Sequence, residues 1–151
     1  MSKSLTKSII IGSDHAGFLV KEKIKIFLKK ANIKLLDIGT FSEERVDYPD
    51  YGKKLALAVK NKTVFGILIC GSGIGVSIAA NRIKKIRAAV CYNKKSASLA
   101  RKHNNANVLC LGARLIDFKN IKTFEHFDLM FLSFDEEKEL KFVEKVKAIK
   151  L

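Results

Sequence analysis

The sequence has only one proline and nine glycines among its 151 residues, which excludes collagen-like and proline-rich chains. It contains no apolar run close to the ~18–20 residues of a membrane span. Its first eight residues are polar and basic and lead into only three isoleucines, whereas a secretion signal needs roughly 7–15 apolar residues. A hydrophobic share of 48% excludes a disordered chain. We therefore expect a cytoplasmic globular protein.

Cysteine is also scarce, with three residues spaced about twenty positions apart. Their number is odd and no Cys-x-x-Cys pair occurs, which argues against a disulfide framework and against a metal site of the zinc type. Cys91 and Cys110 belong to short apolar runs and are interpreted as buried strand residues. Cys70 precedes a glycine-rich turn and needs separate consideration.

Acidic residues are few, because 15 aspartates and glutamates stand against 29 lysines and arginines, for a formal net charge of +14. Such a charge suits nucleic-acid binding. However, only five of the basic residues are arginine, the residue that makes bidentate contacts with phosphates and bases, and the lysines are scattered along the chain. We favour a solvated lysine surface that attracts small anions, and specific nucleic-acid binding is not expected.

Short β-rich runs alternate with longer amphipathic stretches along the chain. The runs predict strands at 8–11, 34–38, 65–70, 87–92 and 107–111. The stretches predict helices at 18–31, 51–60, 73–83, 94–103, 117–132 and 135–149, with an irregular loop at 39–50. This alternation indicates an α/β fold, a three-layer Rossmann-like sandwich around a five-stranded parallel sheet. We expect residues 1–151 to form a single domain.

Such sheets bind ligands at the carboxyl ends of their strands, where the sequence has three unusual turns. Gly-Ser-Asp-His-Ala-Gly at 12–17 follows the first predicted strand, Cys-Gly-Ser-Gly-Ile-Gly at 70–75 ends the third, and Gly-Ala-Arg at 112–114 follows the fifth. A further polar segment, His-Asn-Asn at 103–105, ends the helix before the fifth strand. These segments supply the candidate site residues.

The turn after the third strand has glycine at alternate positions, Gly71, Gly73 and Gly75. Exposed backbone N–H groups at a helix N-terminus predict an anion site. The turn is not a P-loop, because no Gly-Lys-Ser/Thr follows it, and its spacing departs from the dinucleotide fingerprint. A tight strand-to-helix turn that merely needs glycine is the structural alternative.

Cys70 lies at the mouth of this turn, where a helix N-terminus favours the thiolate form of a cysteine. It is a candidate nucleophile or general base. A thiol phosphatase would place an arginine six residues later, and that position is Val76. On these residues alone, a purely structural cysteine stays open.

The other polar candidates each have a structural alternative. Asp14 can accept hydrogen bonds from sugar hydroxyls or cap a helix, and His15 can donate to a phosphate. His103 suits a helix C-terminus by its charge alone. Arg114 either binds phosphate or is a surface charge. His126, flanked by Phe124 and Phe127 at nearby positions of a predicted helix, is interpreted as structural.

Four segments in register resemble type B ribose-5-phosphate isomerase, a family grouped with the galactose-6-phosphate isomerase subunits. They are GSDHAG, DIGTFSEERVDYPDYG, GILICGSGIGVSIAANRIKKIRAAVC and ARKHNNANVLCLGAR, and they cover the chain from Ile9 to about Arg114. The resemblance implies an aldose–ketose isomerase of the pentose phosphate pathway that interconverts ribose 5-phosphate and ribulose 5-phosphate. It implies no metal and no organic cofactor.

The resemblance also implies roles for individual residues. Cys70 matches the base that removes the proton beside the carbonyl, which produces an enediolate, and His103 matches the acid that opens the furanose ring. Ser72 stands where many members have threonine and keeps the hydroxyl. The implied substrate contacts are Asp14 with sugar hydroxyls or the ring oxygen, Asn104 with the sugar, His15 and Arg114 with the phosphate, and the backbone N–H groups of Gly71, Ser72, Gly73, Ile74 and Gly75 with the enediolate charge.

In this family the site is shared across a dimer interface, so the resemblance implies a homodimer or a dimer of dimers in which the 103–105 segment serves the partner. The helix at about 135–149 would pack on or near the partner. This chain departs from the family there, because Lys138 and Phe142 stand where two phosphate-binding arginines are usual, although Lys141 could substitute. Lysine lacks the bidentate fork, so weaker phosphate binding is expected.

Two alternatives to a pentose-phosphate isomerase remain at this point. One is an isomerase of a six-carbon sugar phosphate, such as allose or galactose 6-phosphate. The other is a non-catalytic protein that binds sugar phosphates or nucleic acid. The presence of Cys70, Asp14 and His103 in one chain favours a self-sufficient enzyme.

Overall fold

The computed structural model describes residues 8–116 and 143–149. In these residues strands and helices alternate in the order β1 (Ile9–Ser13), α1 (Phe18–Lys30), β2 (Leu35–Asp37), α2 (Tyr48–Val59), β3 (Phe65–Cys70), α3 (Ile74–Asn81), β4 (Ala88–Val90), α4 (Lys94–Asn104) and β5 (Val108–Gly112). Residues 143–147 are helical. The predicted helix at 117–132 and most of the one at 135–149 lie outside the described residues, as do His126 and Lys138.

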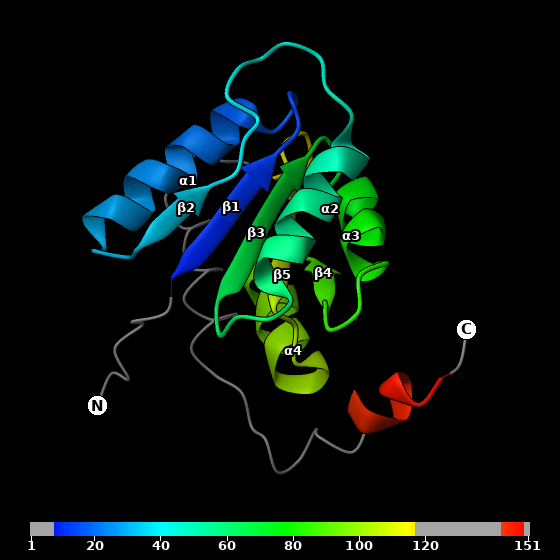
Figure 1. Ribbon diagram of the computed structural model, residues 1–151. Coiled ribbons are helices and arrows are strands. Elements are labelled where there is room, and N and C mark those ends of the chain that lie inside the picture. Colours follow the sequence, from blue (N-terminus) through cyan, green and yellow to red (C-terminus); the bar gives the residue numbers. More distant parts are fainter. Residues whose placement is uncertain (1–7, 117–142, 150–151) are drawn as a thin grey trace.

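The strands form one five-stranded sheet in the order β2-β1-β3-β5-β4, and every pair is parallel (Figure 1). This arrangement confirms the predicted fold class. The longest strand, β3, lies at the centre and is buried along its whole length. The chain leaves the neighbouring strands β1 and β3 in opposite directions, so the crevice at their carboxyl ends is a topological switch point where such sheets bind ligands.

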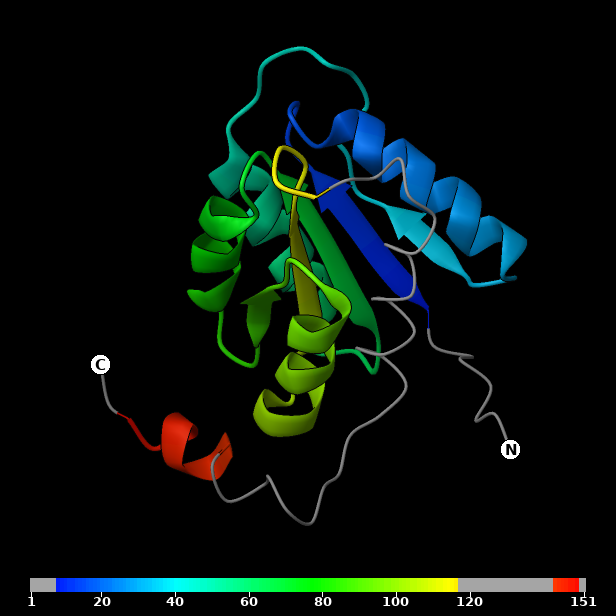
Figure 2. The same cartoon turned by 180° about the vertical axis from the view of Figure 1, so that it is seen from behind.

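Two helices cover each face of the sheet. Buried side chains of α1 and α4 pack with Ile67 and Ile69 of β3 on one face, and those of α2 and α3 pack with Leu68 and Cys70 on the other. Figures 1 and 2, which view the molecule from opposite sides, show these two layers. The alternation follows from the period of two in a strand, which sends successive side chains to opposite faces. Cys70 is therefore held rigidly at the end of a buried strand.

The boundaries agree with the prediction within two residues, except at the start of one helix. Helix α2 begins at Tyr48, so the predicted loop at 39–50 ends early. Pro49 lies in its first turn, where the N–H that proline lacks has no helical acceptor and its loss costs nothing. The edge strands β2 and β4 are three residues each, shorter than predicted, because each pairs on one side only. No helix in the described ranges is long and apolar enough to cross a membrane.

Candidate active site

The carboxyl ends of three strands are tied together by backbone hydrogen bonds. The N–H of Asp14, after β1, donates to the carbonyl of Ile69 in β3 at 3.2 Å. The N–H of Arg114, after β5, donates to the carbonyl of Gly71 at 3.0 Å. The three polar turns predicted from the sequence therefore meet at one edge of the sheet.

Cys70 is buried at this edge, and its Sγ accepts a hydrogen bond of 3.1 Å from the N–H of Gly73. That donor stabilises negative charge on the sulfur. Gly73 has φ +78°, and a side chain there would meet the backbone of Leu111 at 2.8 Å, so the turn requires glycine. The N–H groups of Gly71, Ser72 and Gly75 have no acceptor among the described residues. The turn thus presents free donors beside a thiol, as an anion site requires.

The other two cysteines have a different environment. Burial raises the pKa of Cys91 to about 11. Burial raises the pKa of Cys110 well above its ordinary value. Both side chains therefore stay neutral thiols at physiological pH, in keeping with the packing role expected for them.

Asp14 and His15 are both held by local backbone contacts. Asp14 Oδ1 accepts a 3.0 Å hydrogen bond from the N–H of Gly17, so this residue does cap the turn before α1, and Oδ2 remains for a ligand. His15 Nδ1 lies 3.1 Å from the carbonyl oxygen of Val46 and 3.2 Å from its N–H. One of these contacts fixes the imidazole through Nδ1, which leaves Nε2 as the nitrogen for a substrate.

An open cavity of about 530 Å³ adjoins these two residues, and the loop after β2 forms its opposite wall. Tyr48 lines it, and a side chain at Gly75 would come within 2.6 Å of the Tyr48 ring, so this tyrosine connects the cavity with the glycine turn. Arg45 also lines the cavity. Neither residue was predicted from the sequence as part of a site, although both lie in the loop predicted after the second strand, which was a usable signal.

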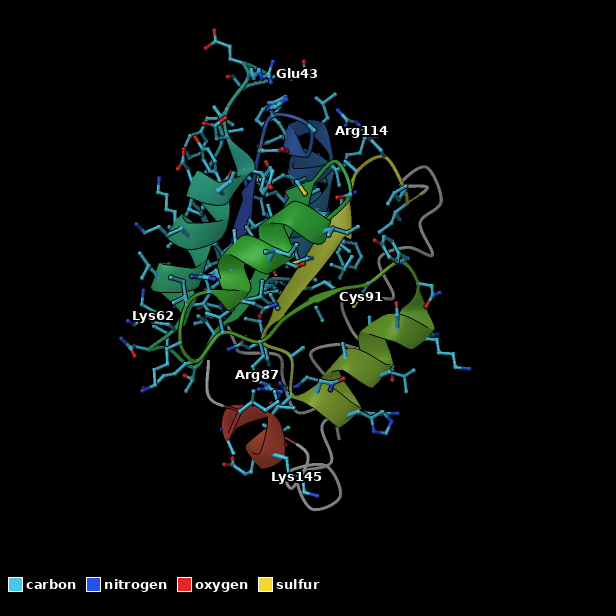
Figure 3. The ribbon with its side chains drawn as sticks, turned by 90° about the vertical axis from the view of Figure 1, so that its right-hand side faces the viewer. Glu43, Lys62, Arg87, Cys91, Arg114 and Lys145 are labelled. Carbon is cyan, nitrogen blue, oxygen red and sulfur yellow. The ribbon has the colours of Figure 1, made fainter. Side chains whose placement is uncertain are left out.

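Arg114 is packed over the glycine turn. A side chain at Gly71 would come within 2.9 Å of Arg114 Nη1, so glycine is what admits the guanidinium to this position. Figure 3 shows Arg114 at the opposite end of the molecule from Lys62 and Arg87. The site therefore combines N–H donors with a cation. In the described part of the chain, no group of three or more histidine, cysteine and carboxylate side chains is arranged to hold a metal ion.

A buried lysine stabilises the loop that carries Arg45. Lys21 of α1 is fully buried and forms an ion pair with Asp37 at the end of β2, and Lys25 contacts the same carboxylate at 2.8 Å. Burial raises the pKa of Asp37, but the hydrogen bonds from the two lysines and from the N–H of Gly39 outweigh it and leave the pKa below its usual value. The ammonium of Lys21 also lies 5.2 Å from the ring centroid of Phe41 in the loop.

Two predicted site residues are not brought to Cys70 within one chain. His103 and Asn104 end α4, which runs back from the carboxyl edge of the sheet to its amino edge. There the Nε–H of Arg87 donates to the carbonyl of Asn104 at 2.6 Å. One chain therefore carries the Cys70 group and the His103 group at opposite edges of its sheet.

Known proteins resemble both the sequence and the fold. The family model described as Ribose/Galactose Isomerase matches residues 9–148. Ribose-5-phosphate isomerase B of Escherichia coli is 47% identical over 117 residues, which cover 77% of this chain and 78% of that protein. Probable ribose-5-phosphate isomerase B of Mycoplasma genitalium is 43% identical over 124 residues, or 80% of this chain and 82% of that one.

A crystal structure of a ribose 5-phosphate isomerase from Thermotoga maritima covers 95% of this chain and 99% of its own, with a TM-score of 0.88 and 45% identity. The ribose-5-phosphate isomerase B of Clostridium thermocellum covers 92% and 94%, with a TM-score of 0.87 and 43% identity. The matched region includes the glycine turn, Asp14, His15 and the His-Asn-Asn segment. On the extent of these matches, the chain belongs to the ribose/galactose isomerase family.

Proposed function

We propose that this isomerase interconverts D-ribose 5-phosphate and D-ribulose 5-phosphate, a reaction of the pentose phosphate pathway in the cytoplasm. The observation that carries the proposal is the Cys70 thiol, which accepts the N–H of Gly73 beside unoccupied backbone donors. Aldose–ketose isomerisation needs one base beside one oxyanion site, and this turn offers both. Relatives named ribose-5-phosphate isomerase B, at 43–47% identity, support the pentose substrate.

Cys70 is the base in this mechanism. Its thiolate removes the proton from C2 of the open-chain aldose, and the electron pair of that bond forms the C1–C2 double bond of an enediolate. The N–H groups of Gly71, Ser72 and Gly75 stabilise the negative oxygen. The thiol then returns the proton to C1, while a proton leaves the oxygen on C2 and one reaches the oxygen on C1. The Ser72 hydroxyl, which accepts from the N–H of Ile74 at 3.1 Å, lies beside this exchange.

The remaining residues bind the substrate. The free Oδ2 of Asp14 accepts hydrogen bonds from sugar hydroxyls, and Asn104 provides a further sugar contact. His15 through Nε2 and Arg114 through its guanidinium bind the phosphate. Lys138, which lies outside the described residues, is assigned to the phosphate by its charge alone.

A second copy of the chain completes the site. His103, which opens the furanose ring as an acid, ends α4 at the opposite edge of the sheet from Cys70, so it serves the neighbouring chain. Helix α3 offers an apolar surface for that neighbour, since Ile74 is 47% and Ile78 is 63% exposed. The protein accordingly acts as a homodimer or a dimer of dimers. Each chain is a single isomerase domain, and its C-terminal helix packs on or near the partner.

The test is an isomerase assay of the wild type and of Cys70→Ala with ribose 5-phosphate. Loss of a general base lowers kcat by about 10²–10⁴-fold, so the variant should fall in this range. Cys91→Ala is the matched control, because it removes a neutral buried thiol, and it should retain kcat within about twofold. Retention of activity by Cys70→Ala would refute the mechanism. Wild-type turnover of allose 6-phosphate but not of ribose 5-phosphate would refute the substrate.

A further inference from the structure

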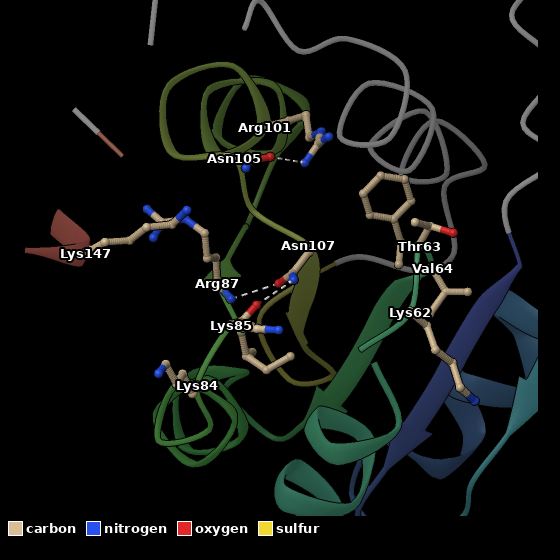
Figure 4. Close-up of a pocket in the computed structure, with 12 residues that line it drawn as sticks. Lys62, Thr63, Val64, Lys84, Lys85, Arg87, Arg101, Asn105, Asn107 and Lys147 are labelled. Carbon is tan, nitrogen blue, oxygen red and sulfur yellow. Dashed lines mark hydrogen bonds between the residues drawn. The ribbon is translucent and has the colours of Figure 1, made fainter. Parts of the chain in front are cut away.

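A basic cavity lies at the amino edge of the sheet, away from Cys70. It has a volume of about 750 Å³, within the range of small-molecule sites. The loops before β3, β4 and β5 and the helical residue Lys147 surround it, as the close-up in Figure 4 shows. Its charged lining residues are all cationic: Lys62, Lys84, Lys85, Arg87, Arg101 and Lys147.

Most of these cations have no anionic partner among the described residues. Within the described residues, Lys62, Lys84, Lys85 and Arg87 form no ion pair. Glu144, whose charge acts on Arg87, pairs with Lys147 at 3.2 Å and does not line the cavity. Burial lowers the pKa of Arg87, and the carboxylate of Glu144 offsets only part of this effect. A bound anion would offset both the repulsion between these cations and the free-energy cost of burying the guanidinium of Arg87.

The loop that carries three of the cations is fixed in place by Asn107. The Nδ2 of Asn107 donates to the carbonyl of Lys85 at 3.0 Å, and its Oδ1 accepts from the N–H of Arg87 at 2.8 Å. Figure 4 shows both bonds. Lys85 has φ +72°, a left-handed conformation that lysine rarely adopts. Such a conformation persists only where the surroundings impose it, and it is typical of ligand-binding loops.

From this geometry we propose that the amino-edge cavity binds a compact anion with two or more phosphate groups. One phosphate meets the loop of Lys84, Lys85 and Arg87, and the second meets Arg101 on the facing side. The described lining residues offer no aromatic face on which a nucleotide base could stack, because the ring of Phe65 is buried and the guanidinium of Arg101 lies 4.9 Å from its centroid. The ligand class is therefore a polyphosphate or a polyphosphorylated polyol.

The experiment titrates the full-length protein with inorganic pyrophosphate by calorimetry at fixed ionic strength. Wild type should bind it saturably and at least about tenfold more tightly than orthophosphate, because two anionic groups engage separate cations. The double variant Lys84→Gln/Lys85→Gln should weaken pyrophosphate binding at least about tenfold. The matched control is Lys53→Gln/Lys54→Gln, which removes two adjacent exposed charges from α2 and should change the Kd by less than about twofold.

Amide chemical shifts recorded during the titration locate the bound anion. Shifts concentrated at residues 84–87 and 105–107 support the proposal. Shifts confined to residues 71–75 would assign the anion to the candidate active site and overturn it. It is equally overturned if pyrophosphate fails to saturate, if both double variants weaken binding alike, or if duplex RNA binds the loop and pyrophosphate does not. None of these readouts depends on isomerase activity.

Discussion

At the carboxyl edge of the sheet, the buried Lys21 is neutralised by carboxylates, and the turn beside the thiol contains glycine where its backbone is left-handed. Asp37 there has two lysine partners, and Gly73 occupies the left-handed position beside Cys70. At the amino edge four lysine and arginine side chains of one cavity, those of Lys62, Lys84, Lys85 and Arg87, form no ion pair within the described residues, and a lysine occupies the left-handed position at 85. The first edge is built for one small oxyanion in a rigid turn. The amino edge has, in the described part of the chain, cations without an ion pair and a residue with a strained backbone. Both features are expected where a bound ligand offsets their cost.

The two edges must meet if the site is shared between chains, and mixing variants tests this most severely. Cys70→Ala and His103→Ala dimers should each have almost no activity. After mixing and subunit exchange, random pairing leaves half of the dimers mixed with one intact site in two, so about a quarter of the wild-type activity should return.

If subunits exchange slowly, the two variants can be unfolded and refolded together, and the same return of activity is expected. A mixture of Cys70→Ala with Cys70→Ser is the control, and it should stay inactive. If the mixture of Cys70→Ala and His103→Ala also stays inactive, each chain uses its own His103. The separation of the two edges within one chain would then require a large rearrangement.

The contrast between Cys70 and the interior of the sheet predicts selective alkylation. A pKa of about 11 leaves the Cys91 thiol about a hundredfold less ionised than an ordinary thiol at pH 8, and Cys110 less still. Iodoacetamide should therefore modify one thiol per folded chain, that of Cys70, and all three after unfolding. Peptide mass spectrometry over time measures the three rates. Equal rates for Cys70 and Cys91 would show that the helix N-terminus does not activate the first.

Much of this arrangement was predictable from the sequence. The β3 run from 65 to 70 and its glycine turn identified the buried strand and the anion site, because a local pattern encodes both. Tyr48 was missed because its contact with Gly75 joins residues far apart in the chain. The predicted start of α2 was too late because Pro49 was assigned to the loop, whereas it lies in the first turn of the helix. The separation of His103 from Cys70 within one chain follows from the direction of α4, and the sequence motif alone does not reveal that direction.

The paired charges of the carboxyl edge predict the next effect. Asp37→Asn leaves the fully buried Lys21 with only Glu22, at 3.2 Å, so it should lower the free energy of unfolding at pH 7 by about 3 kcal/mol. Glu22→Gln, at a more exposed carboxylate, should cost less than about 1 kcal/mol. Urea unfolding measures both. Equal effects would mean that Asp37 does not hold Lys21.

Acid should reduce the effect of Asp37→Asn. The lysines keep the folded-state pKa of Asp37 below its unfolded value. Its stabilisation is therefore complete above the ordinary carboxyl pKa of about 4 and is lost as the pH falls through the lowered folded-state pKa. Wild type and variant should accordingly converge in stability below about pH 4. A constant difference between them down to pH 2 would contradict this assignment.

The smallest predicted effect is an increase in the free energy of unfolding, and it tests the backbone strain at the amino edge. Lys85→Gly places glycine at φ +72° and removes an unpaired cation, so it should raise the free energy of unfolding by about 0.5–1 kcal/mol. Asn32→Gly is the control at φ +57°, and it should change stability by less than about 0.5 kcal/mol because asparagine tolerates this conformation. If Lys85→Gly also weakens pyrophosphate binding, lysine at this position lowers stability and supports anion binding. If it destabilises the protein, contacts of the lysine side chain outweigh the strain, and the two edges differ in charge alone.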